Sequence, residues 1–156
     1  MTHGNDPKAF FTEYVLPAIE DWKHQPTSIR LATLALCELD NLSEHWLRHE
    51  HGLRYGEPLM KQQVAPKRDE LCRDHLFLAL ARDVHDTHKH GCLNRPNALI
   101  KQGQKATVGD GGASGELAYG EAPGENLEIK TDEGATYDVS AVISDCRSFF
   151  GRALGL

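Results

Sequence analysis

The chain lacks any apolar run of about 18 residues, so we expect no membrane span and no membrane partner. Its first residues, Met1–Asp6, have neither a positively charged lead nor an apolar segment, which argues against a signal peptide. No Cys-x-x-Cys pair occurs, and in a chain without a secretion signal scattered cysteines predict buried or free thiols. Those cysteines are Cys37, Cys72, Cys92 and Cys146. Together these absences favour a cytoplasmic protein.

The chain also has fewer positively than negatively charged residues. Seventeen Lys and Arg residues stand against twenty-three Asp and Glu, giving a formal net charge of −6 and a pI of about 5.8. This balance excludes a uniformly basic nucleic-acid surface, although it leaves a local basic patch open. A length of 156 residues with 40% hydrophobic residues fits one domain, residues 1–156, with one modest core.

Apolar residues recur at spacings of three and four through most of the first ninety residues, which predicts amphipathic helices. The predicted helices cover residues 7–22, 26–50 and 67–90. Pro17 should kink or interrupt the first helix, Pro26 suits the first turn of the second, and Gly91 suits a helix end. The first two helices should pack as an antiparallel pair, because their link is short. We expect the aromatic residues at helical spacing to be core: Phe10, Phe11, Tyr14 and Trp22.

After residue 95 the composition changes to short alternating runs with turn signals. We expect strands near 106–108, 116–119, 127–130 and 135–137, with a hairpin turn at Asp132–Gly134. An amphipathic helix over 140–154 should close the chain. The predicted fold class is therefore α+β, mainly α. It consists of an antiparallel bundle of three main helices over 7–95, followed by a small antiparallel sheet and a C-terminal helix over 96–156.

Glycine is concentrated in one tract, Gly109–Gly115. The tract has neither a Gly-x-Gly-x-x-Gly pattern nor the Lys-Ser/Thr ending of a phosphate-binding loop, and Asp110 would repel phosphate. We interpret it as a connection between strands and expect no cofactor there.

The densest titratable stretch follows the apolar run of the third predicted helix. It carries Arg82, Asp83, His85, Asp86 and His88 within seven residues, with a lysine and a histidine directly after them. Histidine titrates near neutral pH and suits proton transfer, whereas arginine grips phosphate oxygens through two donors. An alternative is a solvated helix end held by local ion pairs.

An arginine, a polar residue and a histidine after several positions, late in a helix of a small helical domain, resemble the HEPN family (higher eukaryote and prokaryote nucleotide-binding). Arg82, Asp83 and His88 match that motif. The resemblance implies RNA binding, and a metal-independent endoribonuclease of the toxin or defence kind where the motif is active. It assigns phosphate binding to Arg82 with help from Lys89, proton transfer to His88, and orientation of the pair to Asp83. Because HEPN motifs usually pair across two chains, it also implies a homodimer.

Helix geometry makes His85 a rival for the histidine role. Six residues turn a helix by about 600°, so Arg82 and His88 point about 120° apart, whereas His85 lies closer to the direction of Arg82. A second resemblance concerns the string Asp83–His90 with the following Leu93, Asn94 and Arg95. It is similar to a motif in short bacterial proteins that join a helical front half to a Gly-rich sheet, and it implies no activity.

Two other functions stay open on the residues alone. Histidines four apart share a helix face, so His45 and His49 could join His85 and His88 in a metal site if the two helix ends meet. We nevertheless expect no metal as the leading interpretation, because the flanking glutamates of zinc-peptidase and di-iron patterns are missing. The other alternative is a non-catalytic dimeric module that binds a protein partner. Cys72 has Arg73 and His75 nearby, but we expect it to join the apolar face.

Overall fold

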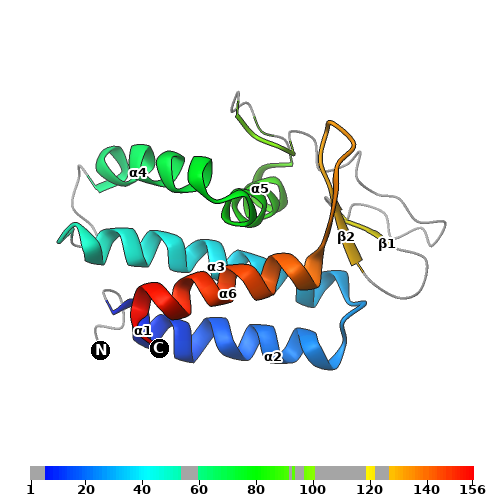
Figure 1. Cartoon of the computed structure of the whole chain (residues 1–156), viewed down its shortest axis with the longest axis horizontal. Coiled ribbons are helices and arrows are strands. Elements are labelled where there is room, and N and C mark those ends of the chain that lie inside the picture. The colour runs from blue at the N-terminus through cyan, green and yellow to red at the C-terminus, as the bar shows by residue number, and fades with distance from the viewer. Residues whose placement is uncertain (1–5, 54–59, 92, 94–96, 101–118, 122–126) are drawn as a thin grey trace.

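The computed structural model describes residues 6–53, 60–91, 93, 97–100, 119–121 and 127–156 (Figure 1). The fold is α+β and mainly α, as predicted. Among the described residues, no helix is long and apolar enough to cross a membrane. The elements in chain order are α1 (Pro7–Phe10), the π-helical turn η2 (Phe11–Val15), α2 (Leu16–His24), α3 (Ile29–Glu50), α4 (Met60–Asp74), α5 (Leu76–His90), β1 (Tyr119–Glu121), β2 (Leu127–Lys130), β3 (Thr136–Asp138) and α6 (Val139–Leu154).

The first predicted helix is interrupted, as Pro17 indicated. The regular α-helix gives way to the wider turn η2 before α2 begins, while the backbone angles stay helical from Phe10 to Leu16, and Pro17 lies in the first turn of α2 directly after the wider turn. The wider turn also shifts the helical register. Tyr14 is 49% exposed in consequence, so its prediction as a core residue is wrong, while Phe11 and Trp22 are buried.

The second helix begins later than Pro26. Ser28 is the N-cap of α3, and its hydroxyl accepts a hydrogen bond from the backbone N–H of Leu31. Pro26 lies in the preceding turn instead, where its carbonyl accepts a hydrogen bond from Trp22 Nε1. Helices α2 and α3 contact each other and run in opposite directions, as expected (Figure 1).

The third predicted helix is two helices. The chain is extended at His75, which separates α4 from α5, and the His75 ring packs on the Phe149 ring at 4.6 Å between centroids. Apolar spacing persists across the break, so the sequence pattern did not reveal it. Helix α4 also starts at Met60 and continues through Pro66, and buried Val64 packs with Leu47 of α3. Helix α5 ends at Gly91 with φ of +77°, as predicted.

The three described strands form one antiparallel sheet in the order β1-β2-β3 at one end of the bundle (Figure 1). The turn at Asp132–Gly134 joins β2 to β3, and Gly134 has φ of +89°, a value that L side chains rarely adopt. Strand β1 (Tyr119–Glu121) overlaps the strand predicted at 116–119 only at Tyr119, and residues 116–118 lie outside the described residues. The strand expected at 106–108 and the glycine tract at 109–115 lie outside the described residues.

One hydrophobic core joins the helices to the sheet. Buried residues of α2, α3 and α5 pack in the same cluster as Leu127 and Ile129 of β2 and the apolar face of α6. That face is the predicted one, because Val142, Ile143 and Phe150 are all buried. Helix α6 therefore packs back on the bundle while it leads directly out of the sheet, and both parts of the chain share a core.

Candidate functional site

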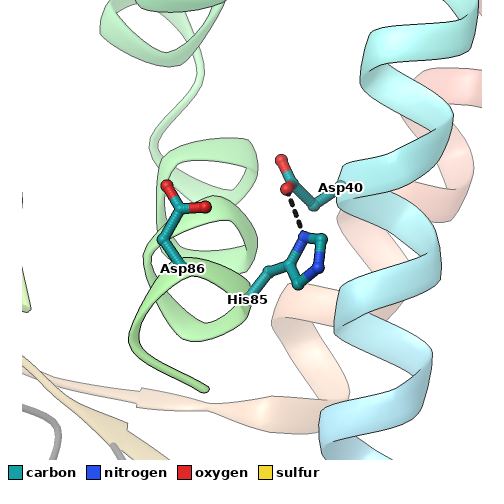
Figure 2. Close-up of side chains that lie close together, drawn as sticks. All are labelled: Asp40, His85 and Asp86. Carbon is teal, nitrogen blue, oxygen red and sulfur yellow. Dashed lines mark hydrogen bonds and ion pairs between the residues drawn. The ribbon is translucent and has the colours of Figure 1, made fainter. Parts of the chain in front are cut away.

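A histidine and an aspartate from different helices form the centre of the site. Asp40 comes from α3 and is 2% exposed, whereas His85 comes from α5 with 24% of its side chain exposed. His85 Nδ1 lies 2.7 Å from Asp40 Oδ2. Figure 2 shows the His85 ring between the two helices with Nδ1 facing the carboxylate. Since an ionised carboxylate only accepts hydrogen bonds, Nδ1 carries a proton and Nε2 is the second titrating atom.

Arg68 of α4 completes this pair from a third helix. Its Nη2 donates hydrogen bonds to both Asp40 oxygens. The Arg68 side chain is 17% exposed, so the ion pair is largely removed from water. Taking charges out of water is costly unless they are paired, and here one carboxylate serves two positively ionisable partners. The arrangement therefore fixes α3, α4 and α5 relative to one another.

The pKa values of both partners follow from this geometry. Burial alone raises the pKa of the Asp40 carboxyl, but the hydrogen bond from His85 and the charge and hydrogen bonds of Arg68 outweigh it. The net pKa of Asp40 is therefore lowered. The hydrogen bond to Asp40 raises the pKa of His85 against the opposing effect of burial, and the charges of Asp40 and Asp86 act in the same direction. His85 thus holds its proton to higher pH than an ordinary histidine.

Arg82 lies one turn before His85 on α5 and is nearly buried, with 11% of its side chain exposed. Its Nη1 donates a hydrogen bond to Asp69 Oδ1 of α4 at 2.7 Å, and its Nε lies 3.8 Å from Asp86 Oδ2. Within the described residues, Nε has no hydrogen-bond partner. The Asp69 side chain is 55% exposed, so the strongest contact of Arg82 is made to a carboxylate at the surface.

Asp83 has a structural task that the motif did not indicate. It is 3% exposed, and its Oδ2 accepts hydrogen bonds from the backbone N–H groups of Leu99 and Ile100. The Leu99 carbonyl in turn accepts a hydrogen bond from the backbone N–H of Asp132, in the turn between β2 and β3. Asp83 therefore connects α5 to the segment that precedes the sheet.

The remaining predicted residues of α5 lie at its exposed end. His88 and Lys89 are exposed in the last turn, close to Gly91. His88 does not line the cavity that Arg82 lines. Arg82 and His88 stay on one helix at different depths, and the buried pairing belongs to His85.

One group within the described residues has the composition of a metal site. Ligand atoms of Asp40, His85 and Asp86 all lie within 4.8 Å of one another (Figure 2). Arg68 already neutralises Asp40 in this group, so a cation is not needed to balance the buried carboxylate. His45 and His49 are not part of the group: the His45 ring stacks on Phe10 at 4.2 Å, and His49 is exposed.

Asp40 and Arg68 are the functional residues that the sequence analysis missed. The sequence did hold a signal for Asp40, because this carboxylate lies on the buried face of α3. Leu36 and Leu39 precede it on that face, and Ser43 follows it. A carboxylate on a buried helix face needs a partner. Arg68 had no comparable signal in the sequence, since it lies on a largely polar helix.

Comparison with known proteins adds no relative. A scan against protein-family models, a search of curated proteins and a search of solved structures each found no match. The resemblance to HEPN domains therefore stays a prediction that rests on the motif.

Proposed function

We propose that this chain is an RNA-binding protein that cleaves RNA without a metal ion, with His85 and Arg82 as its central groups. The observation that carries the proposal is the 2.7 Å hydrogen bond between His85 Nδ1 and the buried Asp40 carboxylate. Such a bond fixes the tautomer and orientation of the ring and leaves Nε2 to transfer a proton. The HEPN-like motif supports the same chemistry but assigns the histidine role to His88, whereas His85 is the rival that helix geometry indicated.

Three groups suited to phosphodiester cleavage follow one another along α5. Arg82, His85 and His88 are each three residues apart, so each lies about 4.5 Å further along the helix axis and points about 60° away from the one before, which leaves Arg82 and His88 about 120° apart. Arg82 is nearly buried, His85 is half-buried and His88 is exposed. In the proposed complex, a phosphate beside His85 has the guanidinium of Arg82 toward the start of α5 and the imidazole of His88 toward its end.

In the proposed reaction the RNA 2′-hydroxyl oxygen attacks the neighbouring phosphorus while the bond from phosphorus to the 5′-oxygen breaks. His88 accepts the proton of the 2′-hydroxyl, and His85 donates its Nε2 proton to the departing 5′-oxygen. The hydrogen bond to Asp40 raises the pKa of His85, which suits it to the acid role. The products are a 2′,3′-cyclic phosphate and a free 5′-hydroxyl.

Arg82 stabilises the charge on the phosphate in this scheme. Without RNA its Nη1 is held by Asp69, whose side chain is 55% exposed. A phosphate oxygen can replace that carboxylate as the acceptor, because the exchange trades one charge-assisted hydrogen bond for another. Lys89, exposed in the last turn, adds positive charge near His88.

The proposal includes a homodimer, as the HEPN resemblance implies, and cytoplasmic RNA as the substrate. Sedimentation of the purified chain tests the dimer independently of cleavage. A monomer that cleaves RNA would remove the dimer from the proposal and leave the chemistry of α5 intact.

The test is cleavage of a labelled RNA by the purified protein in excess EDTA. We expect His85→Ala and Arg82→Ala to lower the rate by about 10²–10⁴-fold, with cyclic-phosphate products from the wild type. His24→Ala is the matched control, since His24 is 75% exposed on the remote helix α2. Circular dichroism melting shows whether each variant folds. No cleavage by the wild type, cleavage that needs a metal, or an active His85→Ala would each overturn the proposal.

A further inference from the structure

A cavity of about 480 Å³ lies between α4, α5 and residues 97–99. This volume falls within the range of about 300–1,000 Å³ that is common for small-molecule sites. Because Arg82 lines the cavity, the cavity adjoins the proposed cleavage site. Asp40, His85 and Asp86 do not line the cavity. The cavity is therefore a neighbour of the site on the α4 side and is not used by the reaction described above.

The lining combines aliphatic surface with charged side chains of both signs. Leu76, Ala79 and Leu99 supply aliphatic surface. Arg73 is exposed and Arg82 is nearly buried, and Asp69, which accepts a hydrogen bond from Arg82, lines the cavity together with Asp83. A ligand with a largely apolar body fits this lining, and a negative group on it would replace Asp69 as the partner of Arg82.

Polar atoms that line the cavity restrict the class of ligand further. The exposed side-chain amide of Asn97 offers both a donor and an acceptor. The Asp83 carboxylate also lines the cavity, and it is held in place by hydrogen bonds from the backbone N–H groups of Leu99 and Ile100. The thiol of Cys72 also lines the cavity, and burial raises its pKa despite the opposing hydrogen bond and charge of Arg82, so at neutral pH it adds no negative charge.

We propose that this cavity receives one unstacked nucleobase of the RNA, with the adjoining phosphate at Arg82. The inference rests on the proposed function and names the part of the substrate that the chain holds beside the cleavage site. Flat bases have apolar faces and hydrogen-bonding edges, and proteins that recognise RNA commonly take splayed bases into such pockets. The base would lie against Leu76 and Ala79, and its edge would face Asn97.

The experiment measures binding of the four nucleoside monophosphates to the full chain by titration calorimetry, with inorganic phosphate as the second probe. Ala79→Phe places a ring in the cavity and should weaken nucleotide binding by about tenfold or more. Ala141→Phe is the matched control, because Ala141 is exposed on α6. Leu76→Asp is a second variant in case Ala79→Phe does not fold. Leu76 is 43% exposed, and Leu34→Asp, at a 40% exposed position of α3, is its control.

The outcomes separate this inference from the proposed function. The base site is supported if nucleotides bind more tightly than phosphate and if Ala79→Phe or Leu76→Asp abolishes this nucleotide binding. This holds even if RNA is not cleaved. Cleavage of RNA that is unchanged in both cavity variants overturns the base site and leaves the catalytic proposal standing. Equal affinity for phosphate and for all four nucleotides also overturns it.

Discussion

His85 Nδ1 lies 2.7 Å from Asp40 Oδ2, although the two residues are 45 positions apart in the sequence. Arg68, from a third helix, donates to both oxygens of the same carboxylate. Three helices thus meet at one buried negative charge. The catalytic proposal and the stability of the bundle both depend on this charge.

Replacing Asp40 should destabilise the fold strongly. In Asp40→Ala, the guanidinium of Arg68 would stay largely buried without its partner, so we expect a loss of about 3–5 kcal/mol in the free energy of unfolding. Urea denaturation measures the loss. The control is Glu20→Ala, which removes an exposed pair with Lys23 and should cost under about 1 kcal/mol. A similar, small loss in both variants would show that the buried network does not stabilise the bundle.

The contribution of His85 to stability should depend on pH in a defined direction. Its pKa is raised from 6.5 in the folded state, so its contribution is complete below the unfolded value and is lost as pH rises through the folded value. Asp40 has a lowered pKa, so its contribution is present above 3.8 and is lost as pH falls through the folded value.

The raised pKa of His85 and the lowered pKa of Asp40 together define one pH range in which the pair stabilises the fold. The free energy of unfolding of the wild type should exceed that of His85→Gln most between about pH 4 and 6.5, and the difference should shrink above that range. Urea titrations at pH 5.5 and pH 9 measure it. A difference that is equal at both pH values, or larger at pH 9, would contradict the assignment of a protonated His85 paired with Asp40.

Asp69 should act as a competitor of RNA for Arg82. Asp69→Asn removes the carboxylate that holds Arg82 Nη1, so we expect RNA to bind several-fold more tightly at low ionic strength, with the gain shrinking as salt is added. Fluorescence anisotropy with a labelled RNA measures the affinity. Asp74→Asn is the control on the same helix, since it removes equal charge from an exposed position outside the cavity. Equal gains in both variants would attribute the effect to net charge alone.

Asp83 should prove structural. Asp83→Ala leaves the backbone N–H groups of Leu99 and Ile100 without this acceptor, so we expect a loss of about 2–3 kcal/mol in the free energy of unfolding. Hydrogen exchange of those two amides should accelerate more than exchange in α3. Asp83→Asn keeps one acceptor oxygen and should lose less. Unchanged exchange at Leu99 in Asp83→Ala would remove this structural role.

The sequence by itself determined the fold class, the apolar faces of the helices, the hairpin turn at Asp132–Gly134 and the helix end at Gly91. These features depend on spacing and on backbone preferences within a few residues, which a single sequence displays. The pattern misplaced the start of α3 by three residues, because the cap at Ser28 competed with the proline at Pro26. It also passed over the break at His75, because apolar spacing continues through it.

Only the tertiary structure decided which charged groups meet. The motif drew attention to α5, and the histidine that it assigned is exposed there, whereas His85 is the one paired with a buried carboxylate. That pairing depends on how α3, α4 and α5 cross, and helical periodicity carries no information about contacts between residues 28 or 45 positions apart. The physical reason is burial: a charge enclosed among three helices must find partners wherever packing brings them, whatever their distance along the chain.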